Sequence, residues 1–158
     1  MAKKITIPND FRLELAMKGY TTTLKGFMYV VREKFDAATA LELIERFFKR
    51  DDRVKNLTKF LKDVFKIEGK DAETYTQWFD AWCEIFGFEY AWLERTKTNA
   101  RFKVTKCPWK TGYKDIGNWC KIWCDIVFAT INPKAIQERY KSMCAGDTYC
   151  EIAFKLEE

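Results

Sequence analysis

The first half of the chain repeats hydrophobic residues at helical spacing. Residues 9–34, 37–50 and 53–65 each carry apolar side chains about three or four positions apart, which is the spacing that gives a helix one apolar face. A fourth segment, residues 72–86, does the same with aromatic side chains and is followed by Gly87. Glycine commonly ends helices because it adopts the left-handed conformation without strain. The pattern predicts four consecutive helices.

After Gly87 the spacing of the hydrophobic residues changes to every second position. Residues 88–95 place aromatic side chains at every second position, and residues 100–108 alternate apolar with polar side chains. Lys106 and Cys107 depart from this alternation. Because a short polar turn joins the two runs, they predict a β-hairpin.

The last third of the chain completes the expected fold. It predicts a helix over residues 113–130, a short helix over 133–140 and a final strand over 148–156. Helices, a hairpin, a helix and a strand follow one another as in an α+β fold, not as in alternating βαβ units. We therefore expect a small antiparallel sheet packed on helices. Residues 1–158 contain no repeat, low-complexity segment or linker, so they predict a single domain.

The composition is typical of a folded protein and argues against some classes of partner. Of the 158 residues, 47% are hydrophobic and 16% aromatic, which is enough to form a buried core. The net charge of +5 comes from 28 basic and 23 acidic residues that are interspersed, so it indicates solubility and not a nucleic-acid partner. No apolar run approaches the roughly 18 residues of a membrane span, and the first residues lack the apolar core of a signal peptide. We expect a cytoplasmic protein with neither a nucleic-acid nor a membrane partner.

Missing residue types exclude several kinds of site. The chain has no histidine, so it has no Ser-His-Asp or Cys-His arrangement and no imidazole ligand for a metal. It also lacks the two common glycine-rich phosphate-binding patterns, GxxxxGK[ST] and GxGxxG. Acid–base chemistry would therefore need Asp, Glu, Lys, Tyr or Cys with a pKa shifted toward neutrality.

Cysteines give the strongest chemical signal. In a reducing cytoplasm, clustered thiols indicate a metal site, an iron–sulfur cluster or catalysis more often than disulfides. Four thiolates suit tetrahedral zinc or an iron–sulfur cluster. The alternative is that they pack as small apolar side chains, which is our interpretation of the isolated Cys83. Five of the six cysteines lie in residues 107–125 and 144–154: Cys107, Cys120, Cys124, Cys144 and Cys150.

Two further features have open interpretations. A dense aromatic run from Trp78 to Trp92 forms either ordinary core or the wall of a pocket for an apolar or planar ligand. Asp125 directly follows Cys124 and is a candidate base, although a surface or capping role fits it equally well.

The cysteine-rich segments form the pattern CPW…C…CD…NP…ER…C.GD.YCEI.F. Over roughly residues 101–154 this pattern resembles the L-2-amino-thiazoline-4-carboxylic acid hydrolase-like family, found widely in anaerobic bacteria and archaea. The upstream segment GFMYVVREKFDAATALELIERF resembles that family's N-terminal helices. The layout is also similar to that of 4-vinyl reductase-type ligand-binding domains. The matching positions are Cys107, Pro108, Cys120, Cys124, Asp125, Pro133, Gly146, Asp147 and Cys150.

These resemblances imply a metal site. In aromatic-sensing relatives of the 4-vinyl reductase-type domains, cysteines in the corresponding late segments hold zinc. The resemblance thus implies a site formed by Cys124 or Cys120 together with Cys144 and Cys150. Cys107 is the natural fourth ligand.

Three functional hypotheses follow. The first is a binding protein for an apolar or planar small molecule, with a zinc or iron–sulfur centre held by cysteines and a sensor or accessory role. The second is a hydrolase that opens a thiazoline-like ring at a C–N bond with a cysteine or a metal-bound water, and with Cys124 and Asp125 as catalytic residues. The third is a structural protein whose cysteines only pack. An exposed aromatic face would further allow a homodimer.

Overall fold

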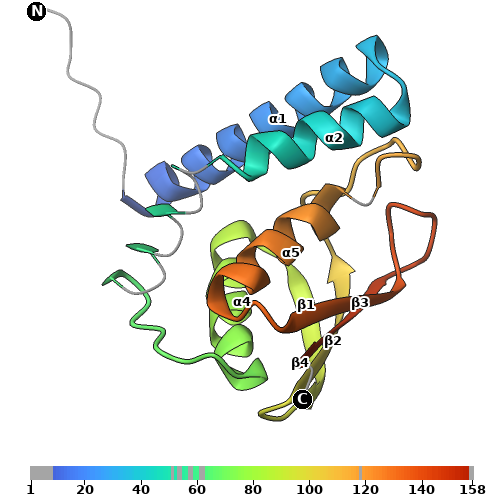
Figure 1. Ribbon diagram of the computed structural model, residues 1–158. Helices are drawn as coiled ribbons and strands as arrows, with labels where there is room; N and C mark the ends of the chain where they lie inside the picture. Colours follow the sequence, from blue (N-terminus) through green and yellow to red (C-terminus); the bar gives the residue numbers. More distant parts are fainter. Residues whose placement is uncertain are drawn as a thin grey trace, which may run out of the picture.

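The computed structural model describes residues 9–50, 52, 55–56, 59–60, 63–117 and 119–156. It confirms the expected α+β fold, with helices packed against a four-stranded antiparallel sheet (Figure 1). The elements follow in the order α1 (Asn9–Lys34), α2 (Ala37–Phe48), α4 (Ala72–Phe86), β1 (Glu89–Arg95), β2 (Asn99–Lys106), α5 (Trp119–Ile131), β3 (Ala135–Lys141) and β4 (Cys150–Leu156).

Helices α1 and α2 form a hairpin that lies over α5 (Figure 1). Asp36 begins α2, because its carboxylate accepts a hydrogen bond from the backbone N–H of Thr39 at 3.0 Å. Every fourth residue of α2 is then buried, namely Ala40, Ile44 and Phe48, so one face of the helix turns toward the body. The apolar residues of α2 recur at helical spacing in the sequence because they form this buried face.

The sheet has the strand order β1-β2-β4-β3, and every neighbouring pair is antiparallel. One face of β2 is buried through Ala100, Phe102 and Val104, as expected for a sheet covered on one side. The opposite face carries charged residues such as Arg101, which forms an ion pair with Glu151 of β4. The covered face is therefore the one that can contribute to an internal site.

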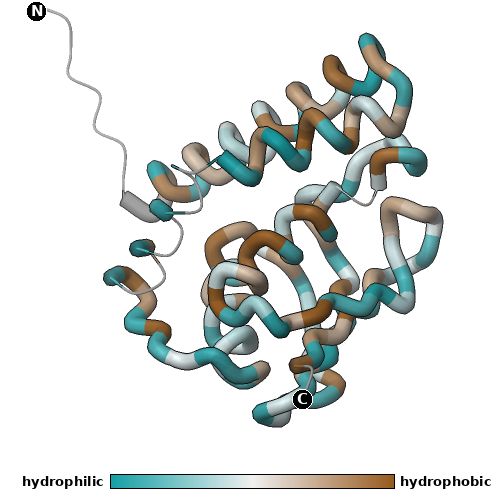
Figure 2. The backbone as a smooth tube through the Cα atoms, in the orientation of Figure 1, coloured by the Kyte–Doolittle hydropathy of each residue, from teal (hydrophilic) through white to brown (hydrophobic). Residues whose placement is uncertain are grey.

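Two hydrophobic clusters fill the interior. One lies between α4, α5 and the covered face of the sheet, where Tyr75 donates a hydrogen bond to the carbonyl of Phe128 at 3.1 Å. The other lies between α1, α2 and α5, around Trp119. Hydrophobic residues are most frequent on α5, whereas α1, α2 and α4 mix hydrophobic with hydrophilic positions (Figure 2). Helix α5 thus takes part in both clusters.

Two predicted elements differ from the structure, and a third is described only in part. The short helix predicted over 133–140 is wrong: residues 135–141 form strand β3, because their backbone pairs with β4, and Gln137 is buried between the exposed Ile136 and the half-buried Glu138. The helix predicted from residue 113 begins only at Trp119, since turns occupy residues 115–117. Of the helix predicted over 53–65, residues 53–54, 57–58 and 61–62 lie outside the described residues, while residues 55–56, 59–60 and 63 are helical.

Replacing Asp71 with alanine is expected to lower the free energy of unfolding by about 1 kcal/mol. Asp71 begins α4, and its carboxylate accepts hydrogen bonds from the backbone N–H and the hydroxyl of Thr74, at 2.8 and 2.7 Å. Urea denaturation measures the loss. The matched control is Asp71→Asn, which keeps an acceptor oxygen and should lose much less. An equal loss in both variants would assign the effect to charge and contradict the capping role.

Candidate functional site

A small enclosed cavity lies where the two hydrophobic clusters meet. Four residues pack against both clusters and also line this cavity: Trp82, Phe88, Cys107 and Trp123. Its volume is about 40 Å³. We call it the cysteine cavity, and it is lined by Trp78, Phe79, Trp82, Phe88, Val104, Cys107, Trp109, Cys120, Trp123, Cys124, Arg139, Cys150 and Ile152.

Aromatic rings form most of the wall. Trp82 is central: its ring lies 5.3 Å from that of Trp78, 5.4 Å from Trp109 and 5.8 Å from Trp123, measured between centroids. These separations fall in the range of favourable aromatic pairs. The aromatic run seen in the sequence is therefore both core and cavity wall, so its two interpretations do not exclude each other.

Four of the five clustered cysteines reach the cavity. Cys120 and Cys124 lie one turn apart on α5 and share the face that turns inward. Cys107 follows the end of β2, and Cys150 begins β4, the neighbouring strand. The structure thus brings together four thiols that are distant in the sequence. The most distant pair, Cys107 and Cys150, is 43 positions apart.

Cys144 and Asp125 lie outside the cavity lining. Cys144 is buried in the turn between β3 and β4, where its Cβ packs against Gly117. Asp125 accepts a hydrogen bond from Lys121 at 2.6 Å and lines a groove between α5 and α2. Cys124 and Asp125 are adjacent in sequence but turn to different sides of the helix. The catalytic roles assigned to them stay predictions.

Three of the four cavity thiols are protonated at neutral pH. Burial raises the pKa of Cys107 and of Cys150 above the usual thiol value, and it raises the pKa of Cys124 to about 12. Both nucleophilic attack and metal ligation require the thiolate. Neutral thiols behave instead as small apolar groups, so these three side chains extend the apolar wall.

The prediction of a metal-binding, hydrolase-like protein is wrong. Across the part of the chain that the structure describes, no group of three or more Cys, Asp or Glu side chains is arranged to hold a metal ion. The physical reason is that the thiols are spread along an aromatic wall, so that no three of them are placed to bind one ion.

Arg139 is the polar residue of the cavity that the sequence did not single out. It lies on β3, and its Nη1 donates a hydrogen bond to Sγ of Cys120 at 3.0 Å. Its Nη2 donates to the amide oxygen of Gln137 at 3.1 Å, when that amide is oriented to donate in turn to Asp125. The alternation of inward and outward side chains in a strand would have revealed it. Gln137 and Arg139 are both inward residues of β3, but this segment was predicted as a helix.

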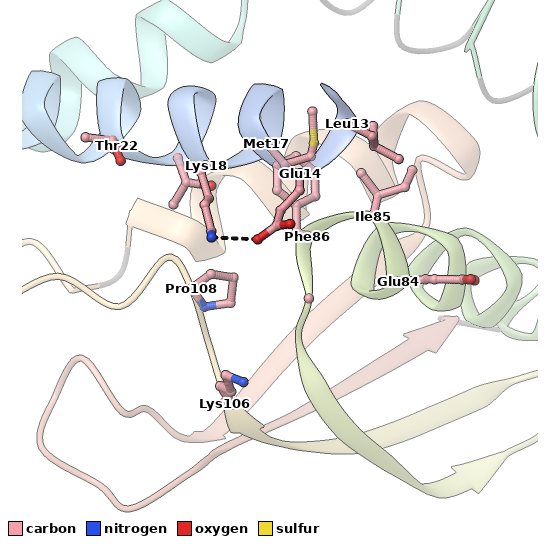
Figure 3. A pocket seen from close by; sticks show the side chains of 12 residues that line it. Leu13, Glu14, Met17, Lys18, Thr22, Glu84, Ile85, Phe86, Lys106 and Pro108 are labelled. Atoms are coloured by element: carbon pink, nitrogen blue, oxygen red, sulfur yellow. Dashed lines mark hydrogen bonds and ion pairs between the residues drawn. The ribbon is translucent and has the colours of Figure 1, made fainter. Parts of the chain in front are cut away.

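Figure 3 shows a second, larger hollow of about 610 Å³ between α1 and the end of α4. It is open to solvent, and both of its lysines are already paired: Lys18 with Glu14 at 2.6 Å and Lys106 with Glu89 at 2.9 Å. The cysteine cavity is less open, and residues that line it carry hydrogen-bond donors that lack partners among the described residues. We therefore take the cysteine cavity as the candidate site.

Comparisons with known proteins show the fold. No protein-family profile and no curated protein matches the chain. Among solved structures, a trafficking protein particle complex subunit 3 from Naegleria fowleri, described as covalently bound to palmitic acid, matches with a TM-score of 0.66 and 11% identity. The match covers 92% of this chain and 97% of that one. In the described residues, no helix has the length and apolar character needed to span a membrane. The chain shares the fold of that subunit, and the resemblance to the thiazoline hydrolase-like family stays a prediction.

Proposed function

We propose that this protein is a binding module for a small apolar or planar molecule, which it holds at the cysteine cavity without chemical conversion. One observation carries the proposal: an enclosed cavity at the junction of two clusters is walled by aromatic rings, aliphatic side chains and neutral thiols, with one arginine. Ligand sites commonly combine such an apolar lining with a few polar groups that fix orientation.

The structural neighbour supports this class of ligand. A subunit with the same fold is described as covalently bound to palmitic acid, so the fold accommodates a long apolar chain. Three of the cavity thiols here have a raised pKa, and a neutral thiol is a poor nucleophile. We therefore propose non-covalent binding for this protein.

The small volume indicates how a ligand would fit. About 40 Å³ holds a head group, whereas whole-ligand pockets usually measure roughly 300–1,000 Å³. Trp82 and Trp123 line both the cavity and an open groove beside it. Rotation of these two rings would join the spaces, so that a head group lies inside and an apolar body extends outward.

Titration with palmitic acid, shorter fatty acids and planar aromatic acids tests the proposal. Four tryptophans line the cavity, so binding should quench or shift their fluorescence in a saturable way. Val104→Phe fills the cavity from β2 and is expected to weaken binding at least tenfold. Ile152→Phe fills it independently from β4.

The matched control is Leu93→Phe, which adds a ring at an exposed position and should bind as the original protein does. Thermal melting establishes that each variant is folded, since overpacking costs about 1–3 kcal/mol. Unchanged affinity in both folded cavity variants would contradict the proposed site. The absence of saturable binding to every probe would contradict the proposed function.

A further inference from the structure

We infer that the cysteine cavity selects organic acids, and that the Arg139 guanidinium binds the carboxylate of the ligand. This inference rests on the proposed function and names the chemical class of its ligand: a monocarboxylate with an apolar chain or an aromatic ring. Three observations carry it, namely a cation without a carboxylate partner, unpaired donors around the cavity, and a cavity of head-group size.

Arg139 is a permanent positive charge in apolar surroundings. Arginine stays protonated in proteins, and a charge removed from water is costly unless it is paired. Within the described residues, Arg32, Arg95 and Arg101 each form an ion pair with a carboxylate, whereas none lies within ion-pair distance of Arg139. Its contacts are a sulfur and a neutral amide, and Asp125 reaches it only through Gln137. A bound carboxylate would supply the missing charge.

Unpaired donors surround the same space. The Nε of Arg139 is buried and has no hydrogen-bond partner among the described residues. The same holds for the indole N–H groups of Trp78, Trp109 and Trp123, three of the residues that line the cavity. Buried donors are nearly always satisfied in folded proteins. The residues that line the cavity thus carry buried donors without acceptors. A carboxylate has two acceptor oxygens and no donor, so it is the ligand group that would satisfy such donors.

The fold directs Arg139 inward. In β3 the residues alternate, with Gln137 buried and Glu138 on the opposite side, where it pairs with Lys155 at 2.7 Å. The pairing with β4 then shifts register between Arg139 and Lys141, which is a bulge-like irregularity. Such irregularities re-aim side chains and recur beside functional sites. Arg139 is thus the last inward residue of β3 before the shift.

Matched pairs of acids and uncharged analogues test the inference. The probes are dodecanoate against dodecanol and 2-naphthoate against 2-naphthalenemethanol, measured by tryptophan fluorescence and isothermal titration calorimetry. The protein is expected to bind each acid about 10- to 100-fold more tightly than its alcohol, the effect of a charge-assisted hydrogen bond. Arg139→Gln should remove this preference by weakening the binding of the acids far more than that of the alcohols, while Arg139→Lys should retain part of it.

Arg95→Gln is the charge-matched control, because Arg95 is already paired with Asp80 at 2.9 Å and lies outside the cavity lining; it should keep the full preference. Equal affinity for acids and alcohols in the unmodified protein would overturn the inference while the proposed function stands. Loss of preference in Arg95→Gln as well would overturn it too, because total charge would then be the cause. No binding of either class would contradict the proposed function itself.

Discussion

Replacing Trp119 with alanine is expected to lower the free energy of unfolding by about 3–5 kcal/mol, the usual cost of deleting a large buried ring. Trp119 is the first residue of α5 and is fully buried. Its ring stacks on Trp109 at 5.3 Å and on Phe48 of α2 at 6.3 Å, centroid to centroid. The deletion would leave a void where α2, α5 and the loop after β2 meet, and rigid surroundings cannot close it fully.

The indole N–H of Trp119 has no partner in the described part of the chain, so its removal also relieves an unsatisfied donor. We therefore expect a loss in the lower half of that range. Urea denaturation at constant pH measures it. Phe35→Ala deletes an aromatic ring that is 46% exposed, and this control should change stability by less than about 1 kcal/mol. A loss in Trp119→Ala no larger than in the control would contradict the packing assigned to this ring.

The sequence predicted the elements whose patterns are strong. Helix α4 has a carboxylate cap at Asp71, apolar spacing along its length and Gly87 in the left-handed conformation at its end, with φ 70°. The hairpin of β1 and β2 has clear alternation on both sides of a polar turn. In these segments local pattern and tertiary packing favour the same structure, which is why local pattern was sufficient.

Strand β3 shows where local pattern fails. Its sequence, AIQERYK, contains good helix formers and only weak alternation. Its strand conformation comes from pairing with β4, a segment that starts nine residues after β3 ends, and tertiary pairing of this kind overrides propensity. The error hid Arg139, because in a helix this residue would not alternate inward with Gln137.

The candidate site was predicted in part. The sequence indicated that thiols gather and that an aromatic run forms a wall, and the structure brings four cysteines into one aromatic cavity. The sequence did not indicate that Cys107 and Cys124 stay protonated. Their raised pKa results from burial by segments that are distant in the sequence. The spacing of the cysteines alone suggested that they are metal ligands. Burial makes the same residues neutral, and this difference changed the expected chemistry from metal binding to apolar binding.

Gly117→Ala is expected to be strongly destabilising, by about 3 kcal/mol, the upper part of the usual cost of overpacking. A Cβ at Gly117 would lie 2.6 Å from the Cβ of Cys144 and 3.0 Å from its carbonyl carbon and oxygen. Neighbouring backbone cannot rotate away as a flexible side chain does. The turn that leads into α5 therefore has to separate from the turn between β3 and β4.

The separation of these two turns would also disturb the cysteine cavity. Gly117 is three residues before Cys120, and Sγ of Cys120 contacts both the Gly117 carbonyl at 3.8 Å and Arg139. Gly112→Ala is the matched control: it is in the same loop, and an added Cβ there would meet nothing within 4 Å. Thermal and urea unfolding compare the two variants, and the acid preference of each reports on Arg139. We expect Gly117→Ala to lose stability and acid preference together, while Gly112→Ala keeps both. Equal stability of the two alanine variants would show that the β3–β4 turn yields freely, and would contradict the close packing that places Cys144 against the start of α5.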